Sequence, residues 1–168
     1  VPLVSFLVLG GRCRSCRSSI SLQYPLVELS GGFLFLFSFL AWGSNPSLWI
    51  YVAFLSVLLL AIGLVDIRKF VIPDELLIVT LAGTLLFFVF GFTDCRILSC
   101  SVFESVWGTS FFAGIFLAFY LFSRGRWIGF GDVKMAALLG LAFGLESSVN
   151  VFMLTFLLGF IIAIILLG

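Results

Sequence analysis

Two aspartates are the residues in this sequence best suited to chemistry. Asp66 directly follows the apolar run 58–65, and Asp132 ends a Gly-Phe-Gly-Asp string that precedes another apolar stretch. Acids beside such apolar runs are costly in a membrane and by default mark function. Two carboxylates held close together do not both ionise easily, so that one can act as a base and the other as an acid. Asp66 and Asp132 are therefore our candidates for a catalytic aspartate pair.

Each aspartate also has a purely structural interpretation. Asp66 is followed closely by Arg68 and Lys69, so it could simply end a span as one half of an ion pair. Asp132 could cap the start of a helix, a role that Asp fills well. A catalytic role for the pair would need no His, Ser or Cys, because two carboxyl groups alone can activate water and polarise a carbonyl. Both interpretations stay open at this point.

The composition limits the classes of protein to which the chain can belong. Of its 168 residues, 62% are hydrophobic and only 10% are charged, against about 45–50% and about 25% in soluble domains. The chain contains no His, which excludes a Ser-His-Asp triad and any His-ligated metal site within it. A net charge of +1 gives no basic field to attract nucleic acid. The composition indicates a protein whose solvent is lipid.

The apolar residues gather in segments that are close to the length of a membrane span, about 20 residues. We expect an all-α, polytopic transmembrane helical bundle with about six spans, the fifth of them short. The expected spans are 24–42, 48–65, 76–92, 102–122, 133–145 and 149–167. Two domains follow: residues 1–23 form part of a cytoplasmic segment, and residues 24–168 form the transmembrane domain. Because the chain begins at Val1 and ends within an apolar run, we expect it to belong to a longer protein.

The basic residues predict how these spans are oriented. When the connecting segments are assigned alternately to the two faces, eight of the nine Lys and Arg residues fall on one face. These eight are Arg12, Arg14, Arg17, Arg68, Lys69, Arg124, Arg126 and Lys134. The positive-inside rule makes that face cytoplasmic. Asp66 and Asp132 are both expected there, at the ends of spans.

Five of the other six acids have simpler interpretations. Asp94, Glu104 and Glu146 fall on the opposite face, where water solvates a loop charge. Asp74 and Glu75 follow Pro73, and there they suit the positive end of a helix dipole.

The two aspartate segments resemble the motifs of type IV prepilin peptidases, a family of GxGD aspartyl proteases. The string Val-Asp-Ile-Arg-Lys-Phe-Val-Ile-Pro-Asp at 65–74 resembles the first aspartate motif, and Gly-Phe-Gly-Asp-Val-Lys at 129–134 resembles the GxGD motif. A Cys-x-x-Cys segment at 13–16 followed by Tyr-Pro-Leu-Val-Glu at 24–28 matches a third feature. The resemblance implies that Asp66 and Asp132 are catalytic. It also implies that the supporting motif residues are Gly129, Gly131, Lys134, Pro73 and Asp74.

The resemblance further implies an activity and a location. Members of the family are multi-pass enzymes of the bacterial inner membrane that cut the leader peptide from type IV prepilins and pseudopilins at the cytoplasmic face. Many also N-methylate the new terminus with S-adenosylmethionine. We therefore expect an aspartic endopeptidase that needs no cofactor for cleavage, whose partners are a prepilin or pseudopilin and membrane lipids. Methyl transfer with S-adenosylmethionine belongs to the expectation for the full-length protein.

The cysteines form two pairs on opposite faces. Cys13 and Cys16 have the spacing of half a tetrahedral zinc site, and two ligands do not complete one. Zinc becomes the better interpretation in a full-length protein that has a second pair upstream; otherwise we expect a reduced, metal-free pair. Cys95 and Cys100 are expected across the membrane, and a disulfide between them and two free thiols remain equal alternatives.

Two other functions compete with the prepilin peptidase. A different GxGD protease, of the presenilin or signal-peptide-peptidase type, would lack the Ile-Pro-Asp string at 72–74 and the Cys-x-x-Cys segment. A proton-coupled membrane transporter could use Asp66 and Asp132 as a relay. A carrier would place such acids near mid-membrane within repeated halves, whereas here both acids are expected at span ends.

Overall fold

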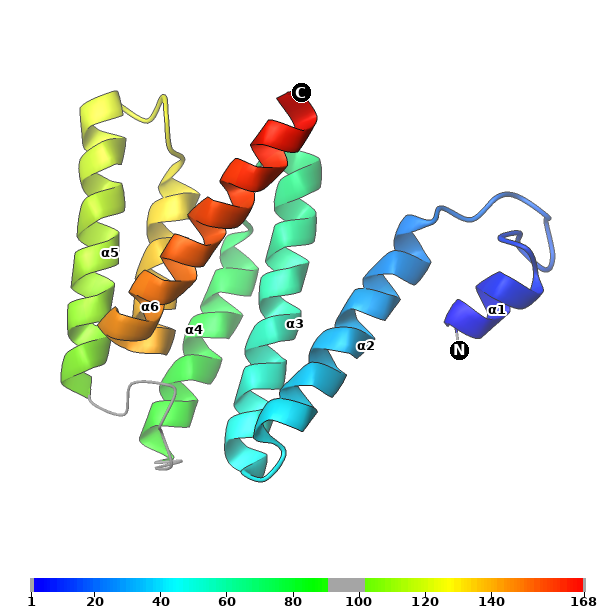
Figure 1. Ribbon diagram of the computed structural model, residues 1–168, viewed down its shortest axis with the longest axis horizontal. Coiled ribbons are helices and arrows are strands. Elements are labelled where there is room, and N and C mark those ends of the chain that lie inside the picture. Colours follow the sequence, from blue (N-terminus) through cyan, green and yellow to red (C-terminus); the bar gives the residue numbers. More distant parts are fainter. Residues whose placement is uncertain (1, 91–101, 168) are drawn as a thin grey trace. The chain divides into compact units, whose positions relative to one another are not determined.

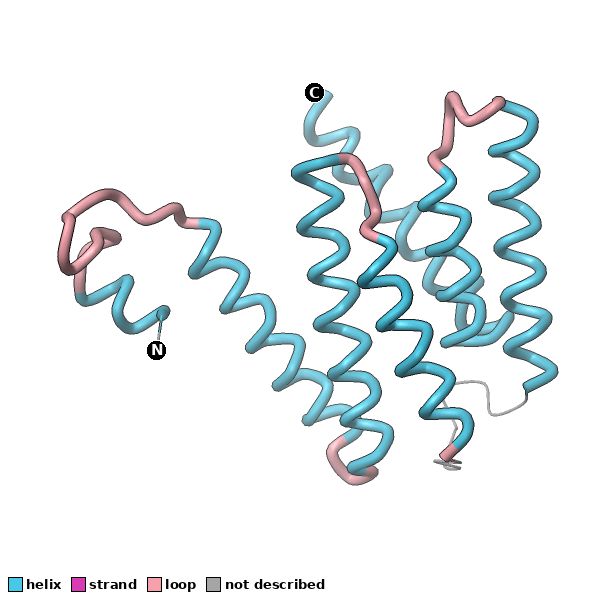
Figure 2. Tube along the Cα trace, turned by 180° about the vertical axis from the view of Figure 1, so that it is seen from behind, coloured by secondary structure: helices cyan, strands magenta, loops and turns pink. Residues whose placement is uncertain are grey.

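The computed structural model describes residues 2–90 and 102–167. In these residues the chain forms helices and no strand, apart from one isolated bridge between Arg12 and Ser19 (Figures 1 and 2). The all-α fold expected from the sequence is confirmed. The helices are α1 (Pro2–Val8), α2 (Gln23–Trp42), α3 (Pro46–Lys69), α4 (Asp74–Val89), α5 (Val102–Ser123) and α6 (Phe130–Leu167).

Within the described residues, four helices are long and apolar enough to cross a membrane. They are α2, α3, residues 103–123 of α5 and residues 130–157 of α6. The expectation of about six spans is therefore slightly too high. Helix α4 has 16 residues, or about 24 Å of rise, against a hydrocarbon core of about 30 Å. The two expected spans 133–145 and 149–167 both lie within α6.

The outer surface of the helices agrees with a lipid environment. In α5, large apolar side chains are exposed on several sides, including Phe103, Trp107, Phe119 and Phe122. A helix that is apolar all round, rather than along one stripe, is typical of a membrane span. With four such apolar helices, the protein is a multi-pass membrane protein.

The chain divides into two compact units, residues 1–63 and residues 64–168, which we describe separately. In the first unit, α1 packs against α2. The indole of Trp49 on α3 meets the rings of Phe35 and Phe39 on α2 edge-on, with centroids 5.2 and 5.4 Å apart. Such edge-to-face contacts favour a defined packing of the two helices. The second unit contains the end of α3 together with α4, α5 and α6.

The second unit is built around a close contact of two glycines. A Cβ placed on Gly140 of α6 would lie 2.5 Å from the backbone oxygen of Gly108 on α5, and a Cβ on Gly108 would lie 2.6 Å from the oxygen of Gly140. No other residue fits at either position, and small residues are what let membrane helices approach closely. Gly140 and Gly144 form a Gly-x-x-x-Gly spacing on this face of α6.

Helix α6 reverses its direction at Gly144. This residue has φ 69° and ψ −177°, a conformation that is essentially restricted to glycine. The hydroxyl of Ser148 donates to the carbonyl of Leu139 at 3.2 Å, whereas residues nine apart on a straight helix would be separated by about 13.5 Å. The part of α6 before Gly144 descends and the part after it ascends in Figure 1. The turn near Glu146 expected from the sequence thus lies at Gly144.

Helix α5 contacts both arms of this reversed helix. Gly108 meets the first arm at Gly140, and Phe112 and Phe116 meet Phe152 of the second arm with ring centroids 5.0 and 5.2 Å apart. The first arm, which carries Asp132 near its start, is therefore held by packing along its length. Packing against α5 therefore supports the position of this arm.

Candidate functional site

Asp66 lies in the last turn of α3, which ends three residues later at Lys69. The N–H of Phe70 donates to the backbone carbonyl of Asp66 at 2.7 Å, and Phe70 has φ +52°, a left-handed conformation that ends the helix. Pro73 follows in an extended conformation, with φ −72° and ψ 124°, and its ring also disfavours helix in Ile72 before it. The side chain of Asp66 is exposed. Residues 70–73 thus form the turn that carries the chain from Asp66 to α4.

Asp132 lies in the first turn of α6. Its N–H donates to the carbonyl of Gly129 at 3.2 Å, and its Oδ2 accepts the N–H of Gly129 at 3.0 Å. This is the reciprocal half of a capping box, in which a side chain one turn inside the helix reaches back to its start. The structural interpretation of Asp132 as a helix cap is therefore correct in part. The side chain is nevertheless exposed, and Oδ1 accepts no hydrogen bond within the described residues.

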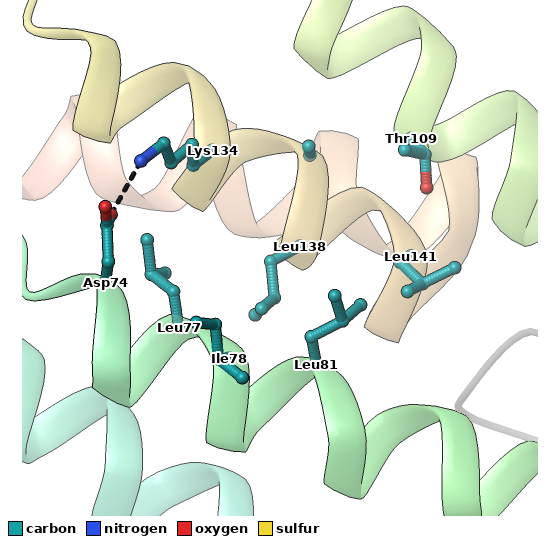
Figure 3. A pocket seen from close by; sticks show the side chains of 9 residues that line it. Asp74, Leu77, Ile78, Leu81, Thr109, Lys134, Leu138 and Leu141 are labelled. Atoms are coloured by element: carbon teal, nitrogen blue, oxygen red, sulfur yellow. Dashed lines mark hydrogen bonds and ion pairs between the residues drawn. The ribbon is translucent and has the colours of Figure 1, made fainter.

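The two aspartate segments contact each other directly. Gly131 approaches Ile72 so closely that a Cβ at residue 131 would lie 3.1 Å from the Cβ of Ile72. The ammonium of Lys134 lies 2.6 Å from Oδ1 of Asp74, and the two residues are 60 positions apart in sequence (Figure 3). These contacts tie the start of α4 to the start of α6. The second glycine of the Gly-Phe-Gly-Asp string is thus needed for close approach.

Asp66 and Asp132 lie at the same end of the second unit. The turns 70–73 and 124–129 are seen together at that end in both views (Figures 1 and 2). Within the described residues, the two carboxylates make no hydrogen bond with each other, and Asp66 makes no ion pair with Arg68 or Lys69. The structure therefore brings together the segments that carry the two acids and leaves both acids accessible.

The other acids follow the expectations in part. Asp74 and Glu75 lie in the first turn of α4, as expected for acids that favour a helix dipole. Asp74 has a second role that was not expected, because its carboxylate also forms an ion pair with Lys134. Glu104 in the first turn of α5 and Glu146 beside the reversal of α6 are exposed. Asp94 lies outside the described residues, as do Arg96, Cys95 and Cys100.

A cavity of about 410 Å³ lies next to the ion pair, between α4, α5 and the first arm of α6. Asp74 and Lys134 form its polar end, and aliphatic side chains form most of the remaining wall (Figure 3). This cavity could not be predicted from the sequence, because its walls come from three separate helices whose residues are apolar throughout. The lining residues are Asp74, Leu77, Ile78, Leu81, Thr109, Lys134, Ala137, Leu138 and Leu141.

The segment ahead of α2 holds Cys13 and Cys16 as free thiols. The backbone of Cys16 and then the hydroxyl of Ser15 donate hydrogen bonds that lower the pKa of the Cys13 thiol to about 6. No group of three or more His, Cys, Asp or Glu side chains that could hold a metal occurs among the described residues. Two thiols fit only half of a zinc site, so we derive no step that uses a metal.

A second cavity, of about 310 Å³, lies in the first unit between α1 and the start of α2. Its wall is mainly apolar and includes Phe6, Leu9, Ile20 and Pro25.

Comparison with known proteins gives two matching sequence profiles. The profile of the type IV leader peptidase family matches residues 53–164, and that of the bacterial peptidase A24 N-terminal domain matches residues 1–42. The first match contains both aspartates and the Ile72–Gly131 contact. The second contains the Cys13 segment and α2.

Curated proteins similar to the chain include several called prepilin leader peptidase/N-methyltransferase. The one from Pectobacterium carotovorum subsp. carotovorum is 33% identical over 172 residues, which cover 100% of this chain and 59% of that protein. The one from Pseudomonas aeruginosa is 34% identical over 169 residues, or 99% of this chain and 57% of that protein. The chain thus spans less than two thirds of the length of these relatives. No solved structure matches it.

Proposed function

This chain belongs to the type IV leader peptidase family, and we propose that it forms the catalytic part of an aspartic endopeptidase that removes leader peptides from type IV prepilins and pseudopilins. The observation that carries the proposal is the contact between the two aspartate segments. Gly131 packs against Ile72 while Lys134 pairs with Asp74, so the segments bearing Asp66 and Asp132 share one end of the second unit.

The proposed mechanism uses one ionised and one protonated carboxyl group. The ionised carboxylate takes a proton from a water molecule. The oxygen of that water molecule attacks the carbonyl carbon of the scissile peptide bond. The protonated carboxyl group donates a hydrogen bond to the carbonyl oxygen, which gains negative charge in the tetrahedral intermediate. When the C–N bond breaks, the carboxyl group that took the proton from water passes it to the leaving amine, and the products are a carboxylic acid and a new amino terminus.

The exposure of both side chains supports this role. A protease must admit both water and an extended peptide to its carboxyl groups, and Asp66 and Asp132 are exposed at helix ends. One oxygen of Asp132 is oriented by Gly129 N–H, which leaves the other oxygen available for water or substrate. Because the backbone donor already orients this side chain, less conformational entropy is lost when the reaction takes place.

We further propose that the protein lies in the bacterial inner membrane with this end in the cytoplasm. Within the second unit, the described basic residues lie in the segments at the aspartate end: Arg68, Lys69, Arg124, Arg126 and Lys134. The positive-inside rule assigns such an end to the cytoplasm.

N-methylation of the new terminus is a second candidate activity, favoured by the names of the relatives. Its methyl donor would be S-adenosylmethionine. Neither cavity described above carries the row of polar groups that a nucleoside donor needs, so we derive no step of methyl transfer from this chain.

The test of the proposed protease is cleavage of a prepilin by the full-length protein in membranes. Asp66→Asn and Asp132→Asn should each lower the rate of cleavage by roughly 10²-fold to 10⁴-fold, which is the usual contribution of general acid–base catalysis. Asn keeps an oxygen that can accept from Gly129, so the start of α6 should persist in Asp132→Asn. Glu146→Gln, at the far end of the second unit, is the matched control and should cleave normally.

Normal cleavage by either aspartate variant would refute the assignment. The proton-coupled transporter makes a different prediction: both variants would abolish proton flux in sealed vesicles, and the wild-type protein would leave the prepilin intact. Exposed acids at helix ends favour the protease over a relay within the membrane.

A further inference from the structure

We infer that Asp74 and Lys134 are positioning residues, which clamp the segment that follows Asp66 against the segment that contains Asp132. This inference rests on the proposed function. We call the two contacts Asp74–Lys134 and Ile72–Gly131 the clasp. The clasp sets the register between the two aspartate segments and takes no part in the bond-breaking step.

The two contacts of the clasp enclose Asp132 in the sequence. Gly131 precedes Asp132 and packs on Ile72, and Lys134 follows two residues later and pairs with Asp74. A single contact would let the start of α6 pivot against α4. Two contacts on either side of Asp132 remove that pivot, so they fix where its carboxylate lies relative to the turn 70–73.

The partners on the other segment are held stiffly. Ile72 and Asp74 are separated only by Pro73, whose ring fixes φ, here −72°. Asp74 is the first residue of α4, so its backbone belongs to a regular helix. A displacement of the clasp is thereby transmitted along the short turn to Asp66, six residues before Ile72.

The side chain of Lys134 is oriented by a second contact besides the ion pair with Asp74. Its ammonium lies 5.3 Å from the centroid of the Phe130 ring, one turn earlier on α6, within the range of a cation–π contact. The Phe130 ring lies 5.6 Å from the ring of Tyr120 on α5. The clasp is therefore connected through Phe130 to the helix that supports the first arm of α6.

The exposure of the ion pair indicates a role in geometry and not in folding. The side chains of Lys134 and Asp74 are 39% and 62% exposed. Ion pairs so open to water contribute little to stability. Catalysis is far more sensitive to position, because a displacement of about 1 Å can lower a rate by about 10²-fold. Loss of the clasp should thus change the rate and leave the fold intact.

Kinetics of prepilin cleavage give the first test. Asp74→Ala and Lys134→Met should each lower kcat by roughly tenfold or more, with KM within about twofold of wild type. Lys134→Arg keeps the charge and Asp74→Asn keeps a hydrogen-bond acceptor, so both should retain most of the activity. The exchanged pair Asp74→Lys with Lys134→Asp should recover part of the loss.

The matched controls remove a neighbouring charge outside the clasp. Glu75→Gln takes away the adjacent acid of α4, and Arg126→Gln takes away a base of the turn before α6; both should cleave at the wild-type rate. A wild-type kcat in Lys134→Met, or an equal loss in the controls, would overturn the clasp.

A cross-link gives the second test, which needs no catalysis. Ile72→Cys with Gly131→Cys, in a full-length protein whose native cysteines are replaced by Ser, should form a disulfide readily in membranes treated with a mild oxidant. The two Cβ atoms would lie 3.1 Å apart, somewhat below the range of about 3.5–4.5 Å found in disulfides, so a small outward shift of the start of α6 brings them to bonding geometry. Adding Lys134→Met should slow this cross-link several-fold, and adding Arg126→Gln should not.

The two tests separate the clasp from the proposed function. A cross-link that forms equally fast with and without Lys134 would refute the clasp, even if Asp66→Asn abolishes cleavage. A cross-link that depends on Lys134 in a protein whose Asp66→Asn variant cleaves normally would refute the proposed catalytic pair and keep the clasp.

Discussion

At the scale of single residues, the segment before α2 holds a thiol with unusual acidity. Cys13 lies in a tight loop: its N–H donates to the carbonyl of Ser18 at 2.9 Å, and its carbonyl accepts the N–H of Arg17 at 3.0 Å. The loop directs hydrogen-bond donors from Cys16 and Ser15 at the Cys13 sulfur, which lower its pKa to about 6. At neutral pH Cys13 is therefore mainly a thiolate, the form that reacts and binds metals.

This acidity predicts a pH dependence of labelling. With Cys16, Cys95 and Cys100 replaced by Ser, the rate at which iodoacetamide alkylates Cys13 should rise with pH through a midpoint near 6 and then level off. The pKa of the thiol is lowered because the hydrogen-bond donors stabilise its charged form, the thiolate. Ser15→Ala removes one donor and should move the midpoint to higher pH, whereas Ser19→Ala should not. A midpoint above 8 in the parent would contradict the hydrogen bonding of this loop.

At the scale of helices, the contact of α5 with α6 depends on two residues that have no side chain. The space between Gly108 and Gly140 is occupied by backbone atoms, which cannot move aside as a flexible side chain would. This contact, together with the reversal at Gly144, decides where the first arm of α6 lies. The start of that arm carries Asp132, so packing far from the site supports its geometry.

Substitution of these glycines tests the contact. Gly140→Ala should lower the free energy of unfolding by about 1–3 kcal/mol, the usual effect of overpacking. Gly114→Ala is the matched control on α5, since a Cβ there meets nothing within 4 Å, and it should be neutral or slightly stabilising. Thermal unfolding in detergent, followed by circular dichroism, measures both. Equal melting temperatures for the two variants would contradict the close approach of the helices.

At the scale of the whole molecule, the distribution of charge favours the proposed orientation, with the aspartate end in the cytoplasm. Helix α5 has Glu104 in its first turn and leads at its other end to the turn that contains Arg124 and Arg126. Its 22 residues extend for about 33 Å, enough to cross the hydrocarbon core. The two ends of α5 are therefore expected on opposite faces of the membrane.

Labelling from the two sides tests this orientation. In a protein without native cysteines, Arg126→Cys should react with a membrane-impermeant maleimide in inside-out vesicles and stay unreacted in spheroplasts. Glu104→Cys should show the reverse. Reaction of both positions from the same side would exclude α5 as a span, and an exchanged pattern would place the aspartates outside the cytoplasm.

Much of this architecture could be predicted from the sequence. Apolar segments and their breaks identify the helices, and counting basic residues places Asp66 and Asp132 at one end. The Ile72–Gly131 and Asp74–Lys134 contacts could not be predicted in this way, because they join positions about 60 residues apart and leave no periodic signal. The position of the reversal in α6 was expected near Glu146, but the backbone conformation that only glycine adopts easily places it at Gly144.

The short elements beside the site have a consequence for the bilayer around them. The first arm of α6, about 14 residues from Phe130 to Gly144, rises by roughly 21 Å, and α4 by roughly 24 Å. Neither matches a hydrocarbon layer of about 30 Å, and such mismatch is accommodated when lipid thins locally at a modest elastic cost. We therefore expect the acyl chains next to the aspartates to be compressed. Lipid chain length would then act directly on the depth at which the two carboxyl groups meet water.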